Sequence, residues 1–210
     1  MDKMNKTRQL ILDVSKQIFL DKGYSATTFQ MIADEANISK TSINYYYARK
    51  QDISNEILSN YIKKCREFII ENGNFDDLMA FLLMVIIFYK AILASQNSRD
   101  FYLDLIRRNN AYSSPHADFQ SFYLSIIYNL NLDISPDELA LKKISIYGAT
   151  NELALNFLTE QLVLEEDQFI STILQCTLSI LKSSEVLIAP SIASSLEIYE
   201  NFDKEKLPVF

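Results

Sequence analysis

The sequence predicts an all-α fold of about nine helices. Only 3 of the 210 residues are glycine and 4 are proline, which is too few turn-forming residues for a β-sandwich or a β-barrel. Apolar residues make up 49% of the chain and charged residues 22%, so the chain can build a packed core and is not intrinsically disordered. In most segments the apolar residues recur at the spacing of one helix face. We therefore expect helices joined by short loops.

Four helices are predicted in the first 72 residues. The first ends before Gly23, a residue that readily takes the left-handed conformation that closes many helices. The second begins at Thr27, whose side chain can cap a helix, with Gln30 at the capping-box spacing. Asn37 tolerates the left-handed region and makes the next turn, and Ser39 is a good N-cap for the third helix. The predicted ranges are 5–22, 27–36, 40–47 and 52–72.

Five further helices are predicted in the remainder of the chain. Residues 78–94 are apolar on all sides, which indicates a central core helix. The run is shorter than the roughly 20 apolar residues that a membrane span needs. Ser135, Pro136 and Glu138 combine a cap, a proline at the first helical position and a capping-box glutamate. The predicted ranges are 77–94, 97–108, 115–131, 136–161 and 165–184, with one short extra helix expected at 191–201.

Charge is divided unevenly along the chain. Residues 1–66 carry 11 Lys or Arg against 7 Asp or Glu, whereas residues 67–210 carry 9 against 20. A basic N-terminal part on an acidic remainder is typical of a chain that contacts a polyanion at one end. The alternative is that the charges of both parts only solvate the surface.

Residues 28–47 have the pattern of a helix-turn-helix. Ala33 is small where two helices would cross, and the turn at Asn37 follows four residues later. The second helix turns polar groups outward, as a helix in the DNA major groove does. The alternative is an ordinary helical hairpin with a solvated face. The apolar side chains that would lock the two helices at a fixed angle are Ile32, Ala36, Ile38 and Ile43.

This segment and its surroundings resemble the tetracycline-repressor (TetR) family of bacterial transcription regulators. The resemblance covers about residues 7–58, because three helices and their spacings match together. Two positions depart from the family pattern: Asn37 replaces the usual glycine of the turn, and Asn44 replaces a tyrosine of the second helix. The matching residues are Ile11-Leu12, Phe19, Lys22-Gly23-Tyr24, Thr27-Thr28, Ile32-Ala33, Ile38-Ser39-Lys40 and Tyr47-Ala48-Arg49-Lys50.

The resemblance implies DNA contacts along the second helix of the motif and at its edges. Lys40 and Thr41 begin this recognition helix and are the first candidates for contacts to base edges, with Ser42 and Tyr45 as second choices. Asn44 has the side chain that reads adenine through N6 and N7, or else it caps or packs locally. The residues assigned to phosphates or to the start of the recognition helix are Thr28, Ser39, Tyr46 and Lys50.

For the rest of the chain the resemblance implies only an architecture. It predicts a DNA-binding domain at residues 1–50 and a ligand-binding and dimerisation domain at 51–210. The helices at 136–161 and 165–184 would pair with a second copy across a two-fold axis. Gly148, inside one of these helices, would make room for a ligand or for a closely packed helix.

The resemblance also implies a ligand pocket among the aromatic residues of the middle helices. The acidic remainder of the chain has few basic groups there, which favours a hydrophobic ligand that is neutral or cationic. The alternative is that these side chains are simply core. The candidate ligand-binding residues are Met84, Phe88, Tyr102, His116, Phe119, Tyr123, Tyr147 and Asn151.

Together these features predict a homodimeric repressor that binds a symmetric DNA operator and releases it when a small hydrophobic ligand enters the C-terminal domain. No cofactor, metal or membrane partner is predicted, and the start of the chain lacks an apolar leader, so we expect a cytoplasmic protein. Cys65 and Cys176 are expected as reduced thiols rather than as a disulfide. The alternative is a constitutive DNA-binding or protein-interaction module without an inducer. An all-helical enzyme is less favoured, because His116 is the single histidine and the glycines cannot form a phosphate-binding loop.

Overall fold

The computed structural model describes residues 3–108, 124, 126–128, 132–181 and 185–210. Within these residues every regular element is helical, which confirms the predicted all-α fold. The helices are α1 (Lys3–Lys22), α2 (Phe29–Glu35), α3 (Lys40–Tyr46), α4 (Lys50–Asn72), α5 (Asp77–Leu93), α6 (Gln96–Arg108), α8 (Pro136–Leu158), α9 (Glu166–Ile180) and α10 (Glu185–Asn201), followed by a 3-10 turn at Lys204–Lys206.

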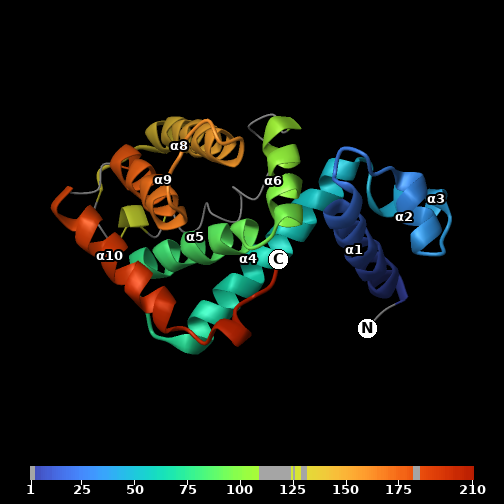
Figure 1. Cartoon of the computed structure of the whole chain (residues 1–210), viewed down its shortest axis with the longest axis horizontal. Coiled ribbons are helices and arrows are strands. Elements are labelled where there is room, and N and C mark those ends of the chain that lie inside the picture. The colour runs from blue at the N-terminus through green and yellow to red at the C-terminus, as the bar shows by residue number, and fades with distance from the viewer. Residues whose placement is uncertain (1–2, 109–123, 125, 129–131, 182–184) are drawn as a thin grey trace.

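The helices form two groups that are joined by α4 (Figure 1). Helices α1, α2, α3 and the first turns of α4, residues 3–57, lie at one end and are called the head. Helices α5, α6, α8, α9 and α10 lie at the other end and are called the body. Helix α4 packs against α1 in the head and against α5 in the body. Because α1 also contacts α6, the head touches the body at a second place.

Helix α5 is the centre of the body. Every side chain from Phe81 to Tyr89 is buried, and the helix contacts α4, α6, α9 and α10. Partners on several sides explain why this segment is apolar all round rather than along one stripe, and they confirm the predicted core helix. None of the described helices is both long and apolar enough to cross a membrane by itself; α5 and α6 meet those criteria only as a pair bent by 112°.

The start of α2 differs from the prediction by one residue. The cap is Thr28, whose Oγ1 accepts a hydrogen bond from the Met31 N–H at 3.2 Å. The predicted cap, Thr27, is buried, and its hydroxyl donates to the Gly23 carbonyl at 2.7 Å. The two adjacent threonines therefore have different roles: Thr27 stabilises the turn after α1, and Thr28 caps the start of α2.

Two later helices differ from the predicted ranges at their ends. Helix α8 stops at Leu158 rather than near residue 161, since Glu160 enters the left-handed region with a φ of 59°. Helix α10 begins at Glu185, before the predicted residue 191, and contains Pro190. The predicted short helix therefore began six residues too late. Most of the predicted helix at 115–131 lies outside the described residues. Within this range, residues 124 and 126–128 are described, and they are helical.

Candidate nucleic-acid interface

Helices α2 and α3 form a helix-turn-helix around one left-handed residue. Asn37 has a φ of 51°, as the sequence predicted, and the following N–H of Ile38 donates to the Ala33 carbonyl at 3.0 Å. Ala33 is 1% exposed, so its small side chain lies at the contact between the helices. Ile32 and Ile43 are both fully buried. These contacts fix the angle between α2 and α3.

The N-terminus of α3 is closed by its own hydroxyl groups. Ser39 Oγ accepts from the Ser42 N–H at 3.1 Å, and the two serine hydroxyls lie 2.8 Å apart. This confirms Ser39 as the predicted cap. Because Ser42 is half-buried and bonded at the cap, it presents less to solvent than its neighbours on the helix.

The outward face of α3 is polar and exposed. Tyr45 is 73% exposed, and its ring meets the half-buried Tyr46 edge-on, with centroids 5.1 Å apart. The Tyr45 hydroxyl lies 4.0 Å from the Met4 sulfur at the start of α1. The other exposed side chains on this helix are Lys40, Thr41 and Asn44.

A polar lock joins the end of α3 to both longer helices of the head. Tyr47 OH donates to Glu56 Oε2 on α4 at 3.0 Å. The Arg8 guanidinium on α1 lies 2.7 Å from the same oxygen and 3.4 Å from the Tyr47 oxygen. Burial is the main cause that raises the pKa of Tyr47 to about 12. The sequence offered no local signal for this lock, because Arg8 and Glu56 are 48 positions apart.

The ammonium group of Lys50 makes a second polar lock. It donates to the carbonyls of Tyr24 and of Thr27, the latter at 2.6 Å, and it lies 4.4 Å from the centre of the Tyr24 ring. The first residue of α4 therefore holds the loop between α1 and α2. The assignment of Lys50 to a DNA phosphate stays a prediction, as does that of Thr28, which is exposed at the start of α2.

The head meets the body at α6 through one hydrogen bond and a group of aromatic rings. Asp104 on α6 accepts from the Ser25 N–H at 2.9 Å. Phe101 stacks on Phe19 of α1 with ring centroids 5.7 Å apart, and its centroid lies 6.3 Å from that of Tyr24. A displacement of α6 therefore acts directly on the loop that precedes α2.

Several predicted ligand-binding residues lie in the core of the body. Met84, Phe88 and Tyr102 are 0%, 5% and 8% exposed, and the rings of Phe88 and Tyr102 are 5.6 Å apart. Burial raises the pKa of Tyr102 to about 12, and it also raises the pKa of Tyr147, whose side chain is hydrogen-bonded to Asn151. His116, Phe119 and Tyr123 lie outside the described residues.

Gly148 does not make room for a neighbour within the described chain. A Cβ at this position would meet nothing within 4 Å, and the residue is exposed on α8. The prediction that Gly148 makes room for a ligand or for a closely packed helix stays a prediction. The two cysteines are free thiols, as expected, with Cys65 buried and Cys176 partly exposed.

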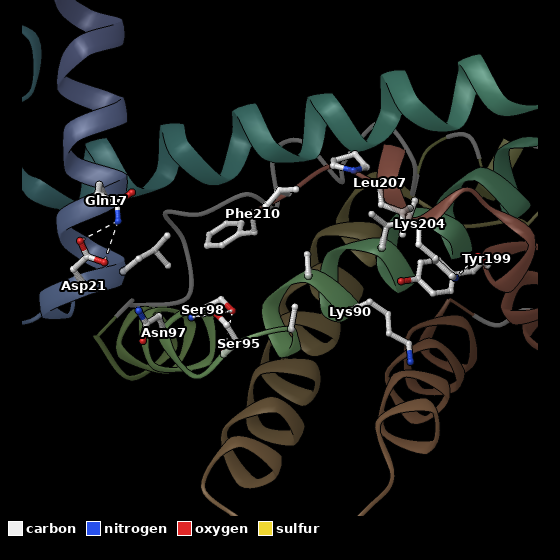
Figure 2. Close-up of a pocket in the computed structure, with 16 residues that line it drawn as sticks. Gln17, Asp21, Lys90, Ser95, Asn97, Ser98, Tyr199, Lys204, Leu207 and Phe210 are labelled. Atoms are coloured by element: carbon white, nitrogen blue, oxygen red, sulfur yellow. Dashed lines mark hydrogen bonds between the residues drawn. The ribbon is translucent and has the colours of Figure 1, made fainter.

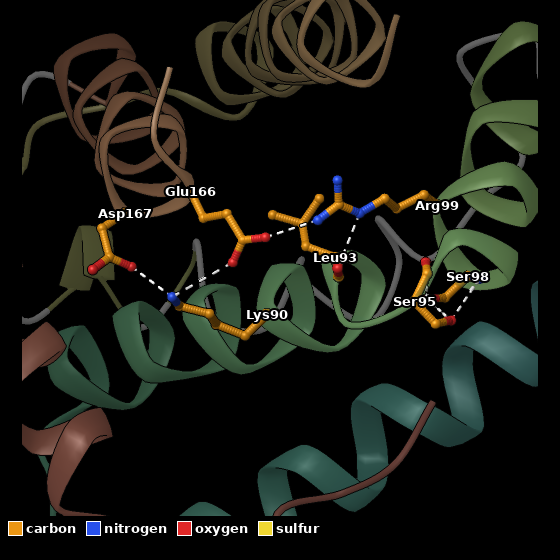
Figure 3. Close-up of polar contacts among 7 residues, drawn as sticks. All are labelled: Lys90, Leu93, Ser95, Ser98, Arg99, Glu166 and Asp167. Atoms are coloured by element: carbon orange, nitrogen blue, oxygen red, sulfur yellow. Dashed lines mark hydrogen bonds and ion pairs between the residues drawn. The ribbon is translucent and has the colours of Figure 1, made fainter. Parts of the chain in front are cut away.

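An ionic cluster joins α5, α6 and α9 (Figure 3). The Lys90 ammonium lies 2.6 Å from Asp167 and 3.9 Å from Glu166. The Arg99 guanidinium lies 2.8 Å from Glu166 and donates to the Leu93 carbonyl at 2.9 Å. The cluster holds the first turn of α9 against the corner between α5 and α6. Sequence reasoning missed it, because Arg99 and Glu166 are 67 positions apart.

Comparison with known proteins places the head in a described family. The sequence profile of the bacterial regulatory proteins of the tetR family matches residues 11–57. The chain is similar to an uncharacterised HTH-type transcriptional regulator, YvkB, of Bacillus subtilis, with 38% identity over 58 residues that make up 28% of this chain and 31% of that protein. It is also similar to IcaR, the HTH-type negative transcriptional regulator of the biofilm operon icaADBC of Staphylococcus epidermidis, with 31% identity over 80 residues, 36% of this chain and 43% of that protein. The matches span less than half the length of these two relatives.

Solved structures share the fold over most of the chain. A tetR-family regulator from Streptomyces coelicolor aligns with a TM-score of 0.55 and 17% identity, over 94% of this chain and 90% of that one. The TetR family protein CprB from S. coelicolor A3(2) aligns with a TM-score of 0.52 and 14% identity, over 94% of this chain and all of that one. The helix-turn-helix geometry and the matching profile agree over the head: residues 11–57 match the bacterial regulatory proteins of the tetR family.

Proposed function

We propose that this protein is a transcription regulator, and specifically a repressor that binds a symmetric DNA operator as a homodimer. The observation that carries the proposal is the outward face of α3. Lys40, Thr41, Asn44 and Tyr45 are exposed on a short helix that is anchored from below by the buried Ile43 and Tyr47. A rigidly held helix with ammonium, hydroxyl and amide groups outward suits the major groove.

Each side chain of this face has a distinct role in the proposal. Lys40 and Thr41 contact base edges at the start of α3, and Asn44, which is exposed, reads adenine. Tyr45 contributes a second base contact beside them. Ser42 is a second candidate for a base contact, Ser39 caps the start of α3, and Thr28, Tyr46 and Lys50 contact the phosphates that position the duplex.

The outer face of α8 supports the dimer part of the proposal. Leu141 is 66% exposed and Ile144 is 43% exposed, and Gly148 on the same helix leaves open space where a partner helix could approach closely. By contrast, Phe169 and Leu174 on α9 are buried within the chain and are not available to a second copy. Two heads about 34–36 Å apart would then reach successive turns of the major groove.

Release by a small hydrophobic ligand completes the proposal. The tyrosine hydroxyls of the body, at Tyr102 and Tyr147, supply hydrogen-bonding groups within a mostly apolar interior. A ligand that binds more tightly to a conformation whose two heads do not match the operator half-sites increases the population of that conformation. Less of the protein is then bound to DNA. The tight packing of Met84 and Phe88 favours the second candidate, a DNA-binding module that has no inducer.

The test is a gel-shift titration with the protein's own upstream DNA and with random duplex, at two salt concentrations. We expect tighter, salt-dependent binding to the upstream DNA as one dimer per site. Lys40→Ala should weaken that binding by about 1–3 kcal/mol, whereas Lys63→Ala, an exposed lysine in the middle of α4, should leave it unchanged. Equal binding to both duplexes, or none to either, would overturn the proposal. If no compound in a screen of hydrophobic molecules dissociates the protein–DNA complex, that result would support the second candidate, a DNA-binding module without an inducer.

A further inference from the structure

A cavity of about 400 Å³ lies where the head, the body and the end of the described chain meet (Figure 2). Its walls come from α1, from α5 and α6, and from residues 204–210. The volume is in the range of ligand-binding cavities. Among the described residues that the sequence predicted for ligand binding, none lines it, so it is a different place from the aromatic interior of the body.

The walls of the cavity are largely apolar. The lining includes Leu20 of α1, Ala91 of α5 and Ala94, which follows α5, and Leu207 and Pro208 come from the end of the chain. Apolar surface that no side chain covers is a favourable contact for the apolar part of a ligand. The two alanines make this surface broad, since larger residues there would occupy the space.

The charged groups at the rim are already engaged. Lys90 is paired with Asp167 at 2.6 Å, and Lys204 lies 3.4 Å from Glu200. Asp21 accepts two hydrogen bonds from the Gln17 amide, at 3.0 and 2.9 Å. A charged ligand could pair with one of these side chains only if that side chain gave up its present contact. The cavity therefore fits an uncharged molecule best.

The chain end that forms one wall is held firmly. The Phe210 ring meets Tyr61 of α4 edge-on with centroids 5.1 Å apart, and it lies 5.5 Å from Phe101 of α6. Tyr61 OH donates to the Pro208 carbonyl at 3.2 Å, and the Lys16 ammonium of α1 lies 5.5 Å from the Phe210 ring centre. The wall therefore exists before any ligand arrives, and it touches both the head and the body.

We propose that this cavity binds a small, uncharged, amphipathic molecule. Its apolar part lies on Leu20, Ala91, Ala94 and Leu207, and its polar end hydrogen-bonds at the rim near Gln17. Because the cavity is bounded by α1 on one side and by α5 and α6 on the other, an occupant bridges the head and the body. The proposal concerns binding alone, and DNA takes no part in its test, so its success or failure is independent of the proposed function.

The test uses two fluorescent dyes that share one aromatic skeleton. N-phenyl-1-naphthylamine is uncharged, and 8-anilino-1-naphthalenesulfonate carries an added sulfonate. We expect the uncharged dye to bind the full chain at one site and at least about tenfold more tightly than the sulfonate. Ala94→Leu, at an exposed position in the cavity wall, should weaken the uncharged dye by at least about tenfold. Ala193→Leu, at an exposed position on α10, is the matched control and should leave it within about twofold.

A second measurement locates the dye without relying on a blocking variant. The chain has no tryptophan, so Val209→Trp, at a residue that lines the cavity and is 81% exposed, introduces a unique emitter. Val163→Trp, at a residue that is 86% exposed and lies between α8 and α9, is the control. Energy transfer to the bound dye should be strong from position 209 and weak from position 163. Equal transfer from both positions, or unchanged affinity in Ala94→Leu, would overturn the proposal.

Discussion

The head and the body of this protein are held together by different kinds of contact. In the head, α2 and α3 have 7 residues each, each is capped by a side-chain hydroxyl, and two polar locks built on Arg8 and Lys50 tie them to α1 and α4. In the body, α5 is buried from Phe81 to Tyr89, and aromatic rings such as Phe157 and Phe169 stack directly, with centroids 4.1 Å apart.

The difference follows from helix length. A helix of two turns is unstable alone in water, so α2 and α3 keep their positions only through the residues that lock them to longer helices. A long buried helix is stabilised by the area it removes from water. Polar substitutions should therefore act mainly on the head, and truncations of apolar side chains mainly on the body and on its junction with the head.

Phe101→Ala should produce the largest effect. The ring is 1% exposed and lies between Phe19 of the head and Phe210, so its loss leaves a cavity at the junction. We expect the free energy of unfolding to fall by about 3–5 kcal/mol, measured by urea denaturation. Ile70→Ala, at a side chain that is 66% exposed, is the control and should change it little. A loss below about 1 kcal/mol for Phe101→Ala would mean that the junction collapses to fill the space.

Lys50→Met should destabilise the head even in the absence of DNA. The substitution leaves the carbonyls of Tyr24 and Thr27 without their charged donor, so we expect a loss of about 1–3 kcal/mol in thermal or urea unfolding without DNA. Lys40→Met removes an exposed charge and should leave unfolding unchanged. Equal stability of the two variants would show that the ammonium of Lys50 contributes nothing to the fold.

Alanine at two glycines should act with opposite sign in the two regions. Gly23 has a φ of 85°, so Gly23→Ala should destabilise the head by about 1 kcal/mol. Gly148 lies inside α8 with open space around it, so Gly148→Ala should stabilise an isolated chain by about 1 kcal/mol. Both are measured by urea unfolding at low protein concentration. A loss of stability or of dimer for Gly148→Ala would instead indicate a partner packed at that position.

Alkaline pH should weaken both regions, and only above the range in which proteins usually work. Burial raises the pKa of Tyr47 in the head and of Tyr102 in the body to about 12, from an ordinary value of 10.0. The unfolded chain loses these protons first, so the stability present below pH 10 is lost as the pH rises toward 12. Tyr47→Phe should make unfolding less dependent on pH in that window, followed by circular dichroism. Tyr45→Phe, at an exposed ring, should leave the pH profile as it is.

More of the structure of the head than of the body could be predicted from the sequence, because the sequence signals in the head are local. The left-handed Asn37 and the cap at Ser39 are set by residues within a few positions, and both were predicted. The lock between Arg8 and Glu56 and the carbonyl partners of Lys50 depend on tertiary packing, and no local pattern marks them. In the body, periodicity identified α5 as core, but it could not say which aromatic rings face each other.

Helix α3 keeps its anchoring residues and its outward residues at separate positions. Ile43 and Tyr47 are buried, whereas Lys40, Thr41, Asn44 and Tyr45 are exposed. Exchanges at exposed positions usually cost little stability. The surface can therefore change by mutation while its scaffold remains intact. A library randomised at the exposed positions alone should consist mostly of folded proteins.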